Sequence, residues 1–240
     1  MSTMRESLTA KREAPFFTAL RAAVAARDAE AEASLFAALP ELPQSRVPFV
    51  LAALGDLRTS GGADLIRQAM TAGRQDARCA GLLALTKREG TDALPDVLAA
   101  LGSSDAELQD YALVCLAVVG DASVWEAVHA RFVTLLRRPV GKVQDVEYPG
   151  DRAALVCLIS WASDRQRELL VDQIRRDWTK IERYRPDLAY WLQRTWPQVR
   201  PTAGPADDVS PPSVEPELAR LRANPLIADE GLPVTLIDSL

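Results

Sequence analysis

The sequence has few of the residues that build disulfide frameworks or metal centres. Among its 240 residues are three cysteines, with no CxxC spacing, and one histidine. An odd number of cysteines without paired spacing argues against a disulfide framework and against a cysteine-based zinc site. A single histidine argues against a histidine-ligated metal. We therefore expect no metal and no cofactor.

Long apolar runs and export signals are also scarce. The longest uninterrupted apolar stretch covers residues 111–119, about half of the roughly 18 residues that a membrane-spanning helix needs. The opening MSTMRESLTAKRE has no apolar segment of the kind found in a signal peptide. These absences predict a cytoplasmic protein that does not bind membranes.

Aromatic residues make up 6% of the chain, whereas apolar residues make up 48% and are dominated by alanine and leucine. This composition favours helices. No P-loop, no GxGxxG after a strand, no HExxH and no GxSxG motif occurs in the sequence, and each of these motifs carries a known chemistry. We therefore expect that the protein is not an enzyme.

Apolar residues recur along the chain at intervals of 31 residues. The large-residue columns are Leu20, Leu51, Leu82 and Leu113, then Leu35, Ile66, Val97 and Val128, then Leu39, Met70, Leu101 and Phe132, and the small-residue column is Ala22, Ala53, Ala84 and Cys115. The interval breaks at 137–151, yet the string ALVCL of 112–116 returns at 154–158. An eleven-residue insertion therefore separates the fourth unit from the fifth.

Each unit has the spacing of two helices joined by a turn. The residues 50–57 and 65–70 both follow a period near 3.6, and the Gly-rich segment 55–64 separates them. A lone helix pair cannot bury its apolar stripe, whereas stacked pairs share one core. We expect an all-α, right-handed α-α solenoid of about five helix pairs, in units near 15–45, 46–76, 77–107, 108–149 and 150–183, followed by a capping helix at 184–196.

Three segments carry a resemblance to a known family. LAALGDLRTSGGADLIRQAM (51–70), DARCAGLLALTKREGTDALPDVLAAL (76–101) and LVCLAVVGDASVWEAV (113–128) are similar to the HEAT-like (armadillo/HEAT) α-helical repeats. The resemblance covers roughly residues 15–183 and implies a scaffold or adaptor. The units depart from the family in being shorter than the usual 40 to 47 residues. They also lack a regular Asp and Arg ladder, of which Asp76 and Arg78 are the best fragment.

Charge and proline content set the end of the chain apart. Residues 131–200 contain 14 Lys and Arg against 9 Asp and Glu, and residues 201–240 contain 2 against 7. Six prolines fall between 197 and 216, which predicts an extended, mobile linker. We expect a largely disordered acidic tail over 197–240 with a possible short helix at 216–223. The alternative is that the tail folds back onto the basic region 131–200 or binds a partner in trans.

The resemblance implies that the second helix of each pair lines an inner, concave surface that binds a partner protein. The candidate partner-binding residues are Asp64, Arg67, Trp125, Glu126, His129, Tyr148, Asp172, Arg175, Arg176 and Trp178. Tyr148 lies in the insertion 137–151, which either projects as a recognition element or bridges a change of superhelical direction. Glu126 and His129 are three residues apart and could pair on one helix face, which we interpret as an exposed pair without a catalytic role.

These features favour a protein-binding scaffold or adaptor, of which an inhibitor or immunity-type protein is one form. The alternative is a HEAT-like DNA-binding protein or DNA glycosylase that uses the basic aromatic region 161–196, with Trp178 and Tyr184 stacking on bases. A pI of about 5.1 and the acidic residues within that region disfavour nucleic acid. We interpret Cys115, Cys157, Trp161 and Trp191 as core residues, and the oligomeric state stays open.

Overall fold

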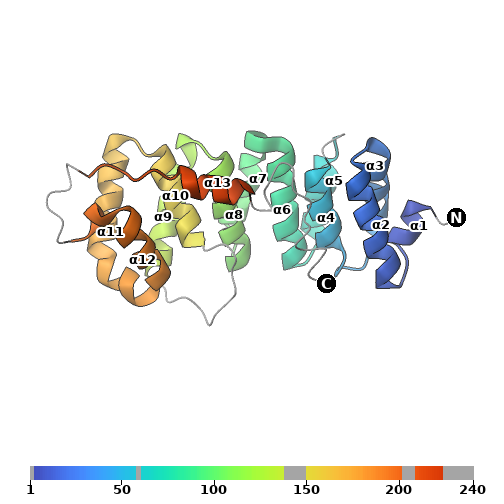
Figure 1. The fold of residues 1–240 in the computed structure, drawn as a ribbon, viewed down its shortest axis with the longest axis horizontal. Coiled ribbons are helices and arrows are strands. Elements are labelled where there is room, and N and C mark those ends of the chain that lie inside the picture. The colour runs from blue at the N-terminus through green and yellow to red at the C-terminus, as the bar shows by residue number, and fades with distance from the viewer. Residues whose placement is uncertain (1–2, 58–60, 138–149, 202–208, 224–240) are drawn as a thin grey trace. The chain divides into compact units, whose positions relative to one another are not determined.

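The computed structural model describes residues 3–57, 61–137, 150–201 and 209–223 (Figure 1). Helices occupy most of these ranges, and none of them contains a strand. The expected all-α class is therefore confirmed. None of the helices described here has the length and apolar character that crossing a membrane requires.

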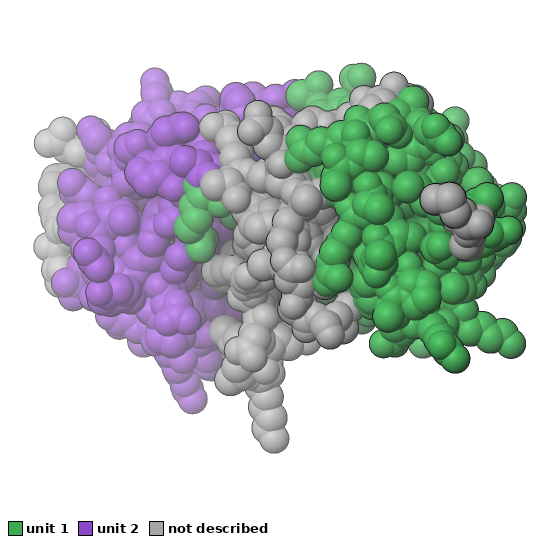
Figure 2. All heavy atoms as spheres, turned by 45° about the vertical axis from the view of Figure 1, so that its right-hand side comes forward, with its two compact units in different colours: residues 1–111, 220–240 green, residues 112–219 purple. Residues whose placement is uncertain are grey.

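The contacts within the chain divide it into two compact units, coloured separately in Figure 2. Unit 1 comprises residues 1–111 together with 220–240, and unit 2 comprises residues 112–219. The division falls inside helix α8 (Ala106–Val119). The sequence predicts one solenoid over 1–196, so each unit is described by itself below.

Unit 1 is built of short helices in consecutive pairs. They are α1 (Met4–Leu8), α2 (Glu13–Ala26), α3 (Ala29–Ala38), α4 (Val47–Asp56), α5 (Ala63–Ala72), α6 (Gln75–Glu89), α7 (Leu94–Leu101) and the first part of α8, with 3₁₀ turns η1 (Leu39–Glu41) and η2 (Gly90–Ala93). Helix α4 packs against α2 and most extensively against α6. The first helices of successive pairs are therefore neighbours in chain order.

Local signals explain where these helices begin and end. The Asp28 side chain caps α3 by accepting a 2.8 Å hydrogen bond from the Ala31 backbone N–H. Prolines occupy the first turns of α4 and α7, where a missing N–H costs nothing. Gly90 ends α6 with a φ of 58°, a conformation that favours glycine.

The repeated apolar columns form the core of unit 1. Its fully buried column residues are Leu20, Leu51, Leu82, Leu35, Ile66 and Val97. Gly55 lets α4 approach α6 closely, because a Cβ at this position would lie 2.9 Å from the Ala84 Cα. Two column members differ from expectation: Ala22 is exposed, with the neighbouring Ala23 buried in its place, and Met70 is only half-buried.

Unit 2 continues with longer helices. Its elements are the end of α8, η3 (Ala122–Val124), α9 (Trp125–Leu136), α10 (Gly150–Trp161), α11 (Asp164–Tyr184), α12 (Pro186–Thr195), η4 (Pro197–Val199) and the part of α13 (Glu215–Ala223) up to residue 219. Helix α9 packs against α10 and α11, and α11 packs against α12. Both copies of the ALVCL string, 112–116 and 154–158, are buried, which confirms Cys115 and Cys157 as core residues.

Two further expectations are confirmed only in part in unit 2. Trp191 is buried as expected, whereas Trp161 at the last position of α10 is 38% exposed, because the chain turns there and leaves the indole at the surface. Part of the tail is placed against unit 2: Val209 and Leu218 are buried, which corrects the expectation of disorder for this stretch. Residues 138–149, 202–208 and 224–240 of the predicted insertion and tail lie outside the described residues.

Candidate functional site

The candidate residue Arg67 lies on α5, and its guanidinium is already paired with carboxylates within unit 1. Its Nε donates to Asp96 Oδ2 at 3.0 Å, its Nη2 pairs with Glu89, and its Nη1 lies 3.3 Å from Asp64. The hydrogen bond that Arg67 donates to Asp96 raises the pKa of Arg67, and the charges of Asp96 and Glu89 add to this against the opposing effect of burial. Asp64 itself is 98% exposed. Arg67 therefore joins α5 to α6 and α7.

The two tryptophan candidates belong to the core of unit 2. Trp125 is 1% exposed, and its Nε1 donates to the Leu158 carbonyl at 3.2 Å. Trp178 is 6% exposed. This corrects the expectation that both indoles lie on an exposed recognition face, because burying a large aromatic side chain contributes more to stability than displaying it.

His129 stacks on Trp125, with 4.6 Å between the ring centroids. Burial lowers the pKa of His129, and the charge of Glu126 only partly offsets this. Its buried Nε2 has no hydrogen-bond partner among the described residues, while Glu126 accepts from Gln166 Nε2 at 3.5 Å. A general base requires an orienting partner and a reacting group within reach, and this imidazole has no such partner in the described part of the chain.

The remaining candidates are scattered. Asp172 and Arg176 are exposed on α11, and Arg175 donates to the Gln198 carbonyl at 2.8 Å. Tyr148 lies outside the described residues. The sequence-predicted residues are therefore not brought together into one site.

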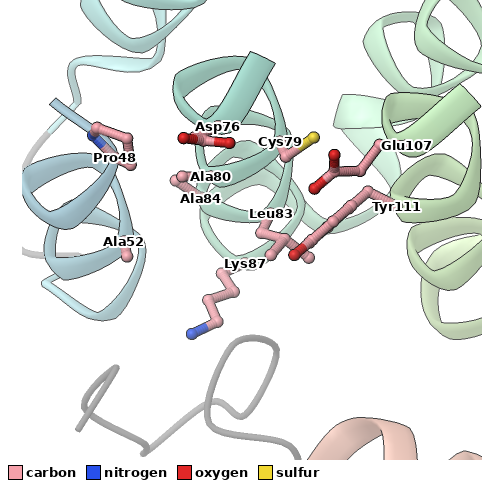
Figure 3. Close-up of a pocket in the computed structure, with 10 residues that line it drawn as sticks. All are labelled: Pro48, Ala52, Asp76, Cys79, Ala80, Leu83, Ala84, Lys87, Glu107 and Tyr111. Atoms are coloured by element: carbon pink, nitrogen blue, oxygen red, sulfur yellow. The ribbon is translucent and has the colours of Figure 1, made fainter. Parts of the chain in front are cut away.

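A recess that sequence reasoning missed lies in unit 1 among the first helices α4, α6 and α8 (Figure 3). We call it the α4–α6–α8 groove; its volume is about 150 Å³. Its lining residues are Pro48, Ala52, Asp76, Cys79, Ala80, Leu83, Ala84, Lys87, Glu107 and Tyr111. Alanine, proline and leucine side chains form its walls, and the two carboxylates come from the first turns of α6 and α8.

Burial and the nearby carboxylates together raise the pKa of the thiol in the groove. Burial raises the pKa of Glu107, and the nearby charges of Asp76 and Asp105 raise it further. The Cys79 side chain, 3% exposed, is directed toward Glu107 (Figure 3). Burial, followed by the charges of Glu107 and Asp105, raises the pKa of Cys79. The thiolate is the nucleophilic form of cysteine, so Cys79 is not set up for covalent catalysis.

Lys87 does not neutralise Asp76 and Glu107, the two carboxylates that form the acidic rim of the groove. Its Nζ lies 2.6 Å from Asp56 Oδ1, and the two side chains are 3% and 1% exposed. Figure 3 shows the Lys87 ammonium directed away from Asp76 and Glu107. The groove is therefore an apolar recess with carboxylates at its edge, an arrangement suited to binding an apolar side chain that ends in a positive charge.

In the described part of the chain, no group of three or more His, Cys, Asp and Glu side chains is placed to hold a metal ion. No protein-family model matches the sequence, and no curated protein matches it. The geometry of the groove and of its neighbouring helices is therefore the basis for the functional conclusion.

The sequence did contain a signal for the charges around the groove. Asp56 and Lys87 are 31 residues apart, which is one repeat, and Arg67 contacts Asp96, 29 residues away. A search for opposite charges at the apolar repeat interval would have found the Lys87–Asp56 pair, whereas the Arg67–Asp96 pair is two residues short of that interval. The depth of the groove had no such signal, because it depends on how closely α4 and α8 approach α6.

Proposed function

We propose that the chain is a non-catalytic protein-binding module, formed by a right-handed α-α solenoid of HEAT-like helix pairs. Two observations support the repeat architecture. The first helices α2, α4 and α6 pack in chain order within unit 1, and polar contacts such as Lys87–Asp56 join residues one repeat apart. Stacked helix pairs of this kind present extended surfaces for other proteins.

The α4–α6–α8 groove is the recess that we propose for the partner, and its acidic rim is the observation that carries this proposal. Asp76 and Glu107 line an apolar recess, while the nearby ammonium of Lys87 is engaged with Asp56. A lysine or arginine side chain of the partner can bury its aliphatic stem against Leu83 and place its charge beside the carboxylates. Opposite charges of this kind steer association and fix register.

Affinity capture with the full chain tests this proposal. We expect a partner protein to be recovered with the wild-type chain and to be reduced by at least about tenfold when Asp76→Lys and Glu107→Lys are combined, because like charges then face each other. Glu168→Lys and Glu182→Lys combined, two exposed charge reversals on α11, are the matched control and should recover the partner as the wild type does. Equal recovery with the groove variant would contradict the proposal.

The form of module that we favour is an adaptor or an inhibitor of the immunity type that masks a basic segment of its partner. No observation favours the DNA-binding alternative. Trp178 is buried, and the Arg185 guanidinium donates to the Leu135 carbonyl at 3.1 Å and lies 3.8 Å from Asp151. Stacking on bases and neutralising phosphates both require exposed groups.

A further inference from the structure

The tail of the chain is seated on unit 2 through a few specific contacts. We call residues 209–219 the strap. Trp196 Nε1 donates to the Ser210 carbonyl at 2.9 Å, and Trp191 Nε1 donates to Glu217 Oε1 at 3.1 Å. Arg152 Nη1 lies 4.0 Å from the same carboxylate oxygen of Glu217. The strap therefore supplies acceptors to two indole donors and a counter-charge to one guanidinium.

The surface beneath the strap requires such acceptors. Trp196 is fully buried and Trp191 is 8% exposed, and a buried indole N–H that loses its partner is costly. The buried Nε of Arg152 has no acceptor among the described residues. An incoming carboxylate thus has one further donor within this surface that the strap leaves unused.

The strap has little helical stability of its own. Helix α13 has nine residues, and isolated helices shorter than about 12 to 15 residues are marginal in water. The apolar anchors of the strap are Val209 and Leu218, and Leu221, which follows the strap in α13, is also buried. The side chains of Glu215, Pro216 and Ala219 are exposed.

We propose that this surface is a second docking site, which binds a helical segment of a partner protein with an acidic first turn, and that the strap occupies it in the absence of that partner. The partner segment resembles the strap in chemistry: a backbone carbonyl for Trp196, a carboxylate for Trp191 and Arg152, and a leucine next to that carboxylate. This site goes beyond the α4–α6–α8 groove and does not depend on it.

Competition by the strap sets the size of the effect to be measured. A flexible tether gives an effective concentration of about 1 mM. If the strap alone binds with a Kd of about 0.1 mM, it is seated about ten times as often as it is free, and a competing segment binds about tenfold more weakly. Releasing the strap removes this factor.

The test uses the full chain with Glu217→Lys and Leu218→Asp combined, which removes the acceptor for Trp191 and the apolar anchor Leu218 of the strap. The probe is a fluorescent, end-capped peptide with the sequence of residues 209–223, VSPPSVEPELARLRA, titrated by fluorescence anisotropy. We expect the released chain to bind the peptide at least tenfold more tightly than the wild type. The chain variant Ala219→Ser, on the exposed side of α13, should behave as the wild type.

A peptide that carries the same two substitutions is the specificity control and should not bind. Equal binding of both peptides, or no gain of binding in a released chain that keeps its helical circular dichroism, would overturn the proposal. Dimers of the wild-type chain at the concentration used in the titration would also overturn the proposal, because a second copy of the chain would then occupy the surface. A failure here would leave the groove proposal untouched, since Asp76 and Glu107 lie in unit 1.

If the released chain fails to fold, hydrogen exchange on the wild-type chain decides the question. Excess wild-type peptide should speed backbone exchange in residues 209–219 while leaving α12 protected. Unchanged exchange in 209–219 at peptide concentrations well above 1 mM would contradict an exchangeable strap.

Discussion

Both units bury carboxylates in ion pairs, but the units differ in how far the cation of each pair is enclosed. In unit 1 both members of the pair are buried: Lys87 with Asp56, and Arg88 Nη1 with Glu32 Oε1 at 2.5 Å, where the two side chains are 5% and 0% exposed. In unit 2 the buried carboxylate of Asp177 pairs with Lys180, whose side chain is 49% exposed, and the buried Trp125 donates to a backbone carbonyl. The most deeply buried cations therefore lie in unit 1.

This difference has consequences for how each unit tolerates substitution. Removing one member of a buried ion pair leaves an uncompensated charge, whereas replacing both members by apolar residues is often neutral. Replacing a tryptophan leaves a smaller penalty, made of lost volume and an unsatisfied carbonyl. Unit 1 should therefore be the more sensitive to single substitutions and the more tolerant of paired ones.

The largest effect is expected for Lys87→Met. Asp56 would keep its buried position without the ammonium, and we expect unit 1 to lose about 3–5 kcal/mol of unfolding free energy. Hydrogen exchange across α4 and α6 together with urea denaturation measures this. Adding Asp56→Leu should recover most of the loss. Arg78→Met is the control, because that side chain is 38% exposed and lies 3.6 Å from Asp105; a loss as large as that of Lys87→Met would refute the contrast.

Trp125→Phe tests how much the buried indole of Trp125 stabilises unit 2. The Leu158 carbonyl would lose its indole donor, and the smaller ring would leave a void, so we expect a loss of about 2–3 kcal/mol. Protection in α9 and α10 should fall while α4 and α6 keep theirs. Trp161→Phe, at a 38% exposed position, should cost less than about 1 kcal/mol. Equal losses from the two substitutions would show that burial does not decide the effect.

Gly55→Ala probes the close approach of α4 to α6. The added Cβ would lie 2.9 Å from the Ala84 Cα, and because backbone atoms cannot rotate away, we expect a loss of about 1–3 kcal/mol. Gly61→Ala is the control, since no heavy atom lies within 4 Å of its added Cβ. Thermal melts of both variants measure the difference. If Gly55→Ala were as stable as the wild type, the helices would not be in backbone contact.

The smallest effect is expected for Glu107→Gln, which should raise the unfolding free energy where the preceding substitutions lower it. The pKa of Glu107 is raised in the folded state. The favourable contribution of protonated Glu107 to the unfolding free energy is therefore complete below the usual pKa of 4.5, and it is lost as the pH rises through the folded pKa. The variant should therefore equal the wild type in acid and exceed it at neutral pH, by no more than about 1 kcal/mol after solvent screening. Urea midpoints from pH 4 to 8 measure this. A variant that is less stable at neutral pH would contradict the assigned cause.

The helix positions could be predicted from sequence because the apolar period is a local signal. Leu51 and Leu82 recur at the repeat interval, and both are fully buried. The end of the period predicted the capping helix in the same way. Helix α12 (Pro186–Thr195) lies within the range 184–196 that the sequence assigns to the capping helix.

The candidate site could not be predicted in the same way, because exposure depends on packing between helices. Trp125 and His129 share a helix face that the repeat places on an inner surface, yet Trp125 is inserted against α10 and takes His129 partly out of solvent. The groove arises where α8 presents Glu107 to Cys79 on α6, a contact between residues 28 positions apart that no single-helix pattern specifies. The strap depends on two tryptophan donors that meet a segment beyond Pro201.

Hydrogen exchange on the full chain, before and after it binds the partner recovered by affinity capture, tests the central claim most directly. Binding at the α4–α6–α8 groove predicts slower exchange in residues 48–56, 76–87 and 106–111. It also predicts unchanged exchange in the second helices α5 and α7. Protection confined to α5 and α7, or the failure of the wild-type chain to retain any protein, would contradict the claim.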